Sequence, residues 1–133
     1  VTRFYSNQVE TVDIDATGNV VLLQNQAITA SASAYTVGTS ATPVDSFSAS
    51  DIRTAKYVLV ARNSGSTQWT AMEVLVVHDG TTAYALPYAI NDTGATTQIT
   101  VDATLAGGVV TLYATGAAAG TVVNKQKIYV VGS

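Results

Sequence analysis

Several residue types that carry common protein chemistry are absent or scarce in this 133-residue chain. It has no cysteine, which excludes disulfide scaffolds, thiol catalysis and cysteine-based metal sites. It has one histidine, which excludes a zinc site built on several histidines. Only six residues are Lys or Arg and the net charge is −3, which argues against a broad basic surface for nucleic acid or anionic lipid. We therefore expect no metal or other cofactor, and neither nucleic acid nor a membrane as a partner.

Charge of both signs is also scarce, because charged residues make up 11% of the chain and hydrophobic residues 47%. This composition excludes an intrinsically disordered chain, which would be polar and highly charged. No apolar run approaches the roughly 18 residues that a membrane helix needs. The apolar content comes mainly from Ala and Val, beside abundant Thr, and this mixture is typical of pleated strands rather than helices. A surface so poor in charge favours a chain that is part of a larger assembly.

Alternation of polar and apolar residues predicts strands along most of the sequence. Residues 54–62 and 68–78 alternate and flank a turn at residues 63–66, which predicts a hairpin. Asp79-Gly80 and Gly107-Gly108 mark further tight turns. Turn signals recur roughly every 8 to 15 residues, as in antiparallel sandwiches and jelly rolls. The sequence therefore predicts an all-β chain whose residues 43–133 form an antiparallel β-sandwich or jelly-roll-like domain.

The N-terminal third differs from the rest in composition. Residues 8–24 predict two strands around a turn at residues 17–19, and residues 27–42 are mostly Ala, Ser and Thr. We interpret residues 1–42 as an extended segment, an arm that binds a neighbouring subunit. The sequence begins with Val rather than Met, so we expect a processed chain or part of a longer one.

Three segments carry a resemblance to a known family. They are Val44-Asp45-Ser46-Phe47, Arg53-Thr54-Ala55-Lys56-Tyr57, and residues 73–84 with the His78-Asp79-Gly80 turn. Together they resemble a β-sandwich domain that recurs in virion structural proteins and fibres of tailed bacteriophages, especially cyanophages. The resemblance spans about Val44 to Val131.

The resemblance implies a non-enzymatic structural component of a virion, either a capsid decoration (cement) protein or a fibre domain. The partners it implies are other copies of the chain, which we expect to form a trimer, and other virion proteins such as the major capsid protein or a fibre protein. The chain would assemble in the host cytoplasm and then belong to the extracellular particle. The resemblance assigns no binding residue.

A catalytic triad is the first chemistry to weigh against this interpretation. Ser64 or Ser66 with His78 and Asp79 has the required residue types. Neighbouring residues on a strand point to opposite faces, however, so His78 and Asp79 do not pair naturally. The same residues are explained by a strand end and an Asp-Gly turn in which Asp79 bonds its own backbone. We predict no catalytic residue and no enzyme activity.

Carboxylates could instead bind metal or pair with bases. Asp13-x-Asp15-x-Thr17-Gly18 imitates the start of a calcium loop, but the twelfth position is Gln24 rather than Glu. A strand–turn–strand unit explains these residues, and we predict no metal site. Glu73 is expected to form a cross-strand ion pair with Lys56 or Arg62.

The alternative function is a carbohydrate- or receptor-binding module at a fibre tip, with a host-surface glycan as partner. Trp69 follows the turn that begins at Asn63, near one end of the domain, where ligands often bind. Tyr88 and Asn91 complete the set of candidate ligand or interface residues. Tyr and Trp are equally enriched in protein interfaces, so both interpretations of these four residues stay open.

Overall fold

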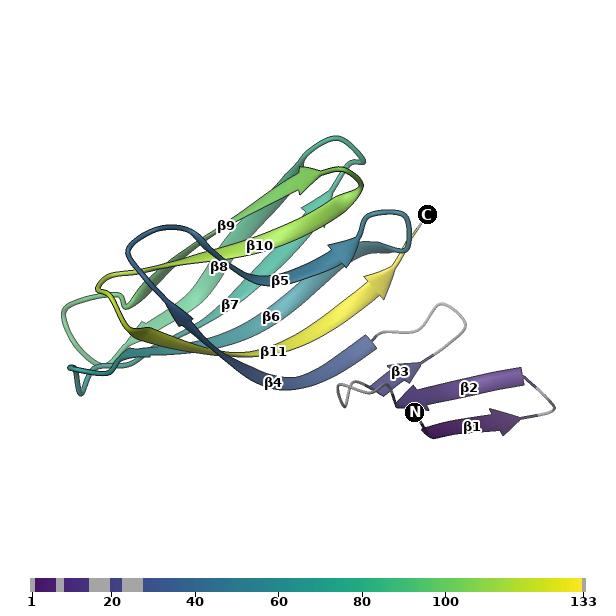
Figure 1. Cartoon of the computed structure of the whole chain (residues 1–133), viewed down its shortest axis with the longest axis horizontal. Helices are drawn as coiled ribbons and strands as arrows, with labels where there is room; N and C mark the ends of the chain where they lie inside the picture. Colours follow the sequence, from purple (N-terminus) through teal and green to yellow (C-terminus); the bar gives the residue numbers. More distant parts are fainter. Residues whose placement is uncertain (1, 7–8, 15–19, 23–27, 133) are drawn as a thin grey trace.

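The computed structural model of the chain describes residues 2–6, 9–14, 20–22 and 28–132, with side chains from residue 34 onward. All regular structure in these residues is β, and the strands pair antiparallel in two sheets (Figure 1). The strands are β1 (Thr2–Ser6), β2 (Val9–Ile14), β3 (Val20–Leu22), β4 (Ile28–Val37), β5 (Thr42–Ser48), β6 (Ile52–Asn63), β7 (Thr70–His78), β8 (Ala83–Asp92), β9 (Ile99–Ala106), β10 (Val109–Gly116) and β11 (Thr121–Val131). The all-β, sandwich-like prediction is confirmed. Its jelly-roll part stays a prediction.

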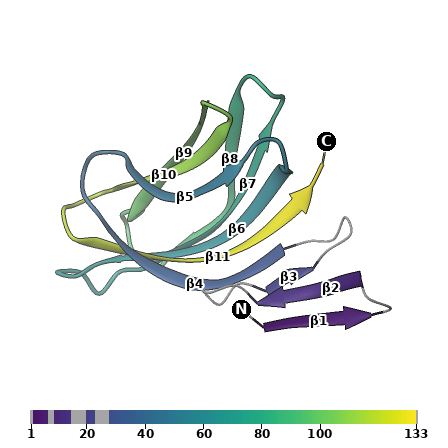
Figure 2. The same ribbon diagram turned by 45° about the vertical axis from the view of Figure 1, so that its right-hand side comes forward.

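The two sheets differ in size. The large sheet has the order β1-β2-β3-β4-β11-β6-β7-β8, and the small sheet has the order β5-β10-β9. Figure 2 shows the small sheet lying over the β11-β6-β7-β8 part of the large one. Strand β8 is an edge strand, which accommodates Pro87 because an edge strand can lack one backbone donor. None of the described segments is a helix with the length and hydropathy of a membrane span.

The core fills the space between the sheets. On β6 the apolar positions predicted to share one face, Ala55, Tyr57, Leu59 and Ala61, are each 0% exposed. Val74 and Val76 from β7 and Val110 and Leu112 from β10 are likewise fully buried. The alternating pattern thus sorts each strand into an inward and an outward face.

The predicted turns connect these strands as expected. Strands β6 and β7 form the predicted hairpin, and the Ser66 N–H donates to the Asn63 carbonyl at 3.0 Å. Gly107 and Gly108 have φ angles of 57° and 76° in the β9–β10 turn, a conformation that favours glycine. The Asp79 carboxylate accepts the backbone N–H groups of Thr81 and Thr82, each at 2.8 Å, so it does stabilise its own turn.

The N-terminal strands extend the large sheet beyond β4. The two strands predicted within residues 8–24 are confirmed as β2 and β3, while the turn predicted at residues 17–19 lies outside the described residues. Strand β4 pairs with β11 from Val37 to Ile28, so residues 28–37 share the sheet of the sandwich. The division of the chain at residues 42 and 43 stays a prediction.

Candidate functional site

A cluster of polar side chains lies between the edge of the small sheet and the large sheet. Its centre is Asp45 of β5, and the other members are Tyr57 of β6 and Lys125, Lys127 and Tyr129 of β11. Lys125 and Lys127 place their Nζ atoms 2.6 and 3.0 Å from Asp45 Oδ1. Tyr57 donates to Oδ2 at 2.7 Å, and Tyr129 donates to the same oxygen. We call these five residues the Asp45 cluster.

A β-bulge explains why a carboxylate enters the sandwich here. Asp45 is opposite Leu112 and Pro43 is opposite Tyr113, so Val44 is the extra residue on β5. The bulge lets consecutive residues, Val44 and Asp45, both point inward, where they are 1% and 8% exposed. Simple alternation would have directed one of them to solvent.

Burial and hydrogen bonding fix the charges of the cluster. Burial alone would raise the pKa of Asp45, but the hydrogen bonds from Lys125, Tyr129 and Tyr57 lower it below its usual range. Burial, together with the Asp45 charge, raises the pKa values of Tyr57 and Tyr129, which keeps both phenols neutral donors. Each carboxylate oxygen of Asp45 accepts two of these hydrogen bonds. The cluster ties the small sheet to two strands of the large one.

Lys125 is buried and fully engaged. Its Nζ also donates to the Val44 carbonyl at 2.5 Å and lies 4.7 Å from the centre of the Tyr35 ring. The sequence indicates this site only through Lys125 and Lys127, two bases in phase with the buried positions Val123 and Tyr129. Inward-facing lysines need a carboxylate partner, but alternation cannot identify one that lies 80 positions away.

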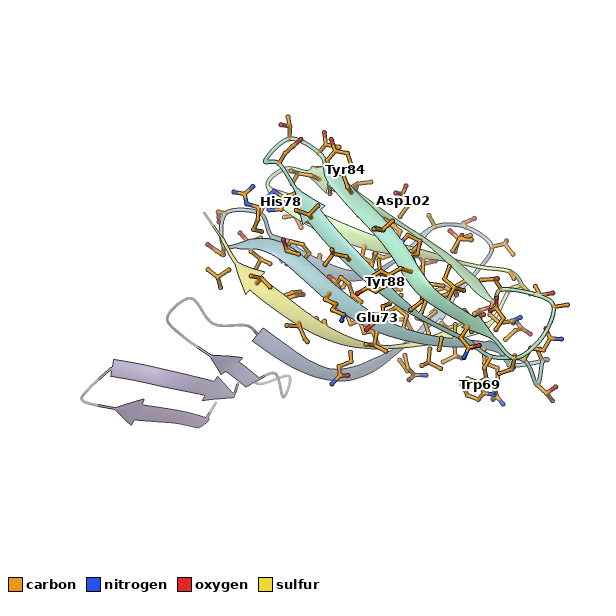
Figure 3. All side chains as sticks on the ribbon, turned by 180° about the vertical axis from the view of Figure 1, so that it is seen from behind. Trp69, Glu73, His78, Tyr84, Tyr88 and Asp102 are labelled. Carbon is orange, nitrogen blue, oxygen red and sulfur yellow. The ribbon has the colours of Figure 1, made fainter. Side chains whose placement is uncertain are left out.

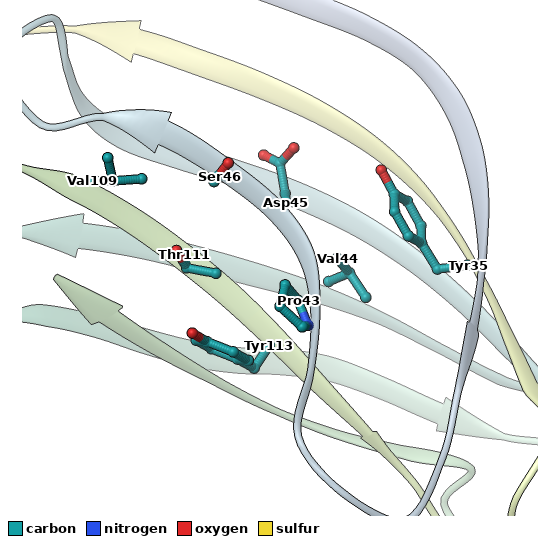
Figure 4. A pocket seen from close by; sticks show the side chains of 8 residues that line it. All are labelled: Tyr35, Pro43, Val44, Asp45, Ser46, Val109, Thr111 and Tyr113. Atoms are coloured by element: carbon teal, nitrogen blue, oxygen red, sulfur yellow. The ribbon is translucent and has the colours of Figure 1, made fainter. Parts of the chain in front are cut away.

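A hollow of about 420 Å³ lies beside the cluster (Figure 4). It extends from β4 across β5 to the outer face of β10, and Val44 and Asp45 contribute to its lining. The side chains that surround it are Tyr35, Pro43, Ser46, Val109, Thr111 and Tyr113. The hollow therefore combines aromatic rings with hydroxyl groups and lacks an unpaired charge among its lining residues.

The outer face of the large sheet has a different character. The register of β11, β6, β7 and β8 places its outward side chains in three adjacent rows: Val130, Thr54, Val77 and Tyr84; Ile128, Lys56, Leu75 and Leu86; and Gln126, Val58, Glu73 and Tyr88. We call these residues the apolar face. Figure 3 shows Glu73, Tyr84 and Tyr88 on it. Leu86 and Tyr84 are 62% and 53% exposed, and the face carries only one residue of each charge. A contiguous exposed surface of this kind is typical of an interaction site.

The predicted ion pair lies on this face. Lys56 Nζ is 3.0 Å from Glu73 Oε1, which confirms the cross-strand pair, and Arg62 instead lies 4.9 Å from the centre of the Trp69 ring. Hydrogen bonding to Glu73 raises the pKa of Lys56. The calcium-loop residues 15–19 and 24 fall outside the described residues. Within the described part of the chain, no group of three potential ligands could hold a metal ion.

The residues weighed as a triad are not brought together. His78 is 3% exposed, with Nε2 2.7 Å from the Ile52 carbonyl oxygen, while Nδ1 accepts the Gly80 N–H at 3.1 Å. Ser64 and Ser66 lie in the hairpin turn at the other end of β7 from His78. His78, at the end of β7, thus contacts the first residue of β6 through its ring and is not part of a triad.

Three of the four candidate ligand residues lie at the end opposite His78, where Figure 3 places Trp69. Trp69 is 41% exposed and pairs through its backbone with Thr93, just beyond Asn91. Asn63 uses its side chain internally, donating to the Ala119 carbonyl at 2.7 Å and accepting the Gly65 N–H at 2.9 Å. Tyr88 lies apart from them, opposite Glu73 on the apolar face. A role of these four residues in binding a ligand or a partner stays a prediction.

Comparison with known proteins gives remote structural likenesses only. No sequence family and no curated protein matches the chain. The tailspike protein of Acinetobacter baumannii bacteriophage Fri1, a capsular polysaccharide depolymerase, shares 14% identity at a TM-score of 0.44, over 80% of this chain and 18% of that one. The tailspike of A. baumannii phage AM24 shares 10% identity at a TM-score of 0.42, over 78% and 26%. The tailspike of Acinetobacter phage vB_ApiP_P1 shares 18% identity at a TM-score of 0.41, over 95% and 22%.

This chain spans between 18% and 26% of the length of these proteins. They are phage tail proteins, which is the broad kind of protein that the sequence resemblance implies. The comparisons do not support the narrower assignment to cyanophages.

The prediction that the chain is not an enzyme is contradicted by the first of these comparisons, since the Fri1 tailspike is a depolymerase. The prediction relied on the family resemblance and on the failure of a Ser-His-Asp arrangement among residues close together in the sequence. Folding or assembly can bring distant carboxylates to the roughly 5 to 9 Å that glycoside hydrolysis requires. Failure of a local Ser-His-Asp arrangement therefore does not exclude catalysis.

Proposed function

We propose that the chain is a β-sandwich domain of the tail apparatus of a tailed phage, and that it holds copies of itself together through the apolar face. The observation that carries the proposal is the set of aliphatic side chains exposed on β7, β8 and β11, including Leu75, Leu86 and Val130. Full burial of such a side chain is worth roughly 1.5–3 kcal/mol, and these three, which are 37%, 62% and 49% exposed, would each gain a proportionate part of it. Covering this face would therefore stabilise an assembly substantially.

A second copy of the chain is the occupant that the charges favour. The apolar face has one base and one acid, Lys56 and Glu73, side by side, so it carries no net charge. Around a threefold axis the base of one copy can meet the acid of the next, so the face is electrostatically complementary to further copies of itself. A partner of strongly acidic or basic character would gain nothing from this surface.

The remaining parts of the proposal concern geometry and location. We expect a trimer, with residues 1–42 acting as an arm on a neighbouring copy and with a fibre protein as the adjoining virion component. Placement on the capsid, beside the major capsid protein, is the second location that the resemblance allows. Immunogold labelling of phage particles distinguishes the two: label along the tail supports the proposal, and label over the capsid contradicts it.

Sedimentation equilibrium tests the assembly. The wild-type chain should form a trimer at micromolar concentration, and Leu86→Glu should be monomeric with an unchanged circular dichroism spectrum, since Leu86 is 62% exposed. Thr104→Glu, on the outer face of the small sheet, is the matched control and should remain trimeric. A monomeric wild type, or equal behaviour of both variants, would overturn the proposal.

A further inference from the structure

We propose that the hollow beside β5 binds a segment of a neutral saccharide chain. The site is distinct from the apolar face and from the Trp69 end of the sandwich, and the inference goes beyond the proposed assembly role. Its lining contains four hydroxyl groups, from Tyr35, Ser46, Thr111 and Tyr113, around a space of about 420 Å³. A volume within roughly 300–1,000 Å³ is typical of small-ligand sites.

The outer face of the small sheet is rich in hydroxyl groups well beyond the hollow. Register places Ser46, Thr111 and Thr104 in one outward row across β5, β10 and β9. Thr100 and Thr115 form another such pair. Hydroxyl groups both donate and accept hydrogen bonds, so an array of them complements the hydroxyl groups of a sugar chain.

Flat apolar surfaces flank these hydroxyl groups. Tyr113 and Pro43 are opposite each other on β10 and β5, and Tyr35 lies at the far side of the hollow on β4. Lys125 Nζ lies 4.7 Å from the centre of the Tyr35 ring, a cation–π contact that favours this ring position. The aliphatic faces of sugar rings pack on such aromatic surfaces, while their hydroxyl groups reach polar neighbours.

Charge selects the class of saccharide. Asp45 is the only ionisable carboxylate of the lining, and its two oxygens already accept hydrogen bonds from Lys125, Lys127, Tyr57 and Tyr129. The lining itself thus offers neither a free carboxylate for a cationic sugar nor a free lysine for an acidic one. The nearest further carboxylate on this face is that of Asp102, opposite Tyr113 and outside the lining, and it disfavours an acidic sugar. Among the described residues, the hydroxyl groups of Ser46, Thr111 and Tyr113 make no internal hydrogen bond, which leaves them available to a neutral ligand.

The test uses the full chain on a glycan array printed with neutral and acidic oligosaccharides of bacterial capsules and O-chains. We expect binding to a neutral oligosaccharide that varies little between 50 and 500 mM salt, about the range over which exposed charge interactions become screened. Calorimetry with that oligosaccharide should show at least a tenfold loss in Tyr113→Ala and a smaller loss in Thr111→Val. Thr82→Val, an exposed position in the β7–β8 turn away from the small sheet, should bind as the wild type does.

Two further variants separate this inference from the other proposals. Leu86→Glu should keep the affinity per site even if assembly is lost, and Trp69→Ala should have no effect. Absence of any neutral ligand, binding confined to acidic glycans, retention of binding in both hollow variants, or its loss in Trp69→Ala would each overturn the inference. The circular dichroism spectrum of every variant must match the wild type, and Thr111→Val provides a near-isosteric test if Tyr113→Ala unfolds.

Discussion

The two outer faces of the sandwich differ in the chemical character of their exposed side chains. The outer face of the large sheet presents Leu, Val, Ile and Tyr side chains with a single ion pair, whereas that of the small sheet presents Ser and Thr with Tyr113, Pro43 and the carboxylate of Asp102. Both are outward positions of antiparallel strands, and backbone geometry gives neither face a preference. The difference is what the two proposals require, in which the apolar face meets protein and the small sheet meets a hydroxylated ligand.

Low overall charge has a different meaning on each face. On the apolar face it permits close packing of aliphatic side chains against the second copy that we propose covers them. On the small sheet it leaves hydroxyl groups free of competing ion pairs. Between the faces, the Asp45 cluster concentrates three of the charged residues of the chain in the interior.

The largest effect is expected from the cluster that joins the sheets. Asp45→Asn removes the partner of the buried Lys125 ammonium and should lower the free energy of unfolding by about 3–5 kcal/mol. Asp102→Asn, at an exposed position of the small sheet, should change it by less than about 0.5 kcal/mol. Urea denaturation measures both. Equal stabilities of the two variants would show that the Asp45 cluster does not hold the two sheets together.

The next effect comes from making one face resemble the other. The double variant Leu75→Thr, Leu86→Thr gives the apolar face hydroxyl groups and should weaken self-association by about tenfold or more. The two Leu side chains expose only 37% and 62% of their surface in the single chain, and full burial of one Leu is worth roughly 1.5–3 kcal/mol. The reverse change, Thr104→Leu on the small sheet, should leave the association constant unaltered. Sedimentation equilibrium of both variants decides whether composition of the apolar face drives assembly.

A smaller effect should appear as a pH dependence of stability. The folded pKa of Asp45 is lowered, so its contribution is complete above the unfolded pKa, about 3.9, and is lost as pH falls through the folded value. The unfolding free energy of the wild type should therefore decline below about pH 4 more steeply than that of Asp45→Asn. Parallel curves for the two proteins would contradict the assignment of a charged, buried Asp45.

The smallest effect concerns the ion pair on the apolar face. Lys56→Glu and Glu73→Lys should each weaken self-association by roughly a few-fold, because exposed pairs contribute little. The double charge swap should restore it if identical faces meet. Additive losses in the swapped variant, measured by sedimentation at low salt, would indicate that the two charges face something other than a second copy.

Local features of the fold were predictable from the sequence, because strands and tight turns depend on neighbouring residues. The alternation in residues 54–62 predicted both faces of β6, and Asp79-Gly80 and Gly107-Gly108 predicted their turns. The order of strands within the sheets could not be predicted from the sequence, since β11 lies between β4 and β6 although it is last in the chain. Pairing between distant strands leaves no local pattern.

The sites were less predictable than the fold for the same reason. The Lys56–Glu73 pair follows from adjacent strands of a hairpin and was predicted. The Asp45 cluster depends on a bulge at Val44 and on a partner strand about 80 positions away, and neither could be read from periodicity. Turn signals in the sequence pointed instead to Trp69 and Asn63.

The absence of cysteine allows a direct test of which face meets another copy. Leu75→Cys on the apolar face and Thr104→Cys on the outer face of the small sheet each introduce a single thiol into the chain. Under mild oxidation, the account predicts rapid disulfide-linked dimers from Leu75→Cys and only monomers from Thr104→Cys. Cross-linking of Thr104→Cys, or of neither variant, would contradict the claim that the copies join through the apolar face.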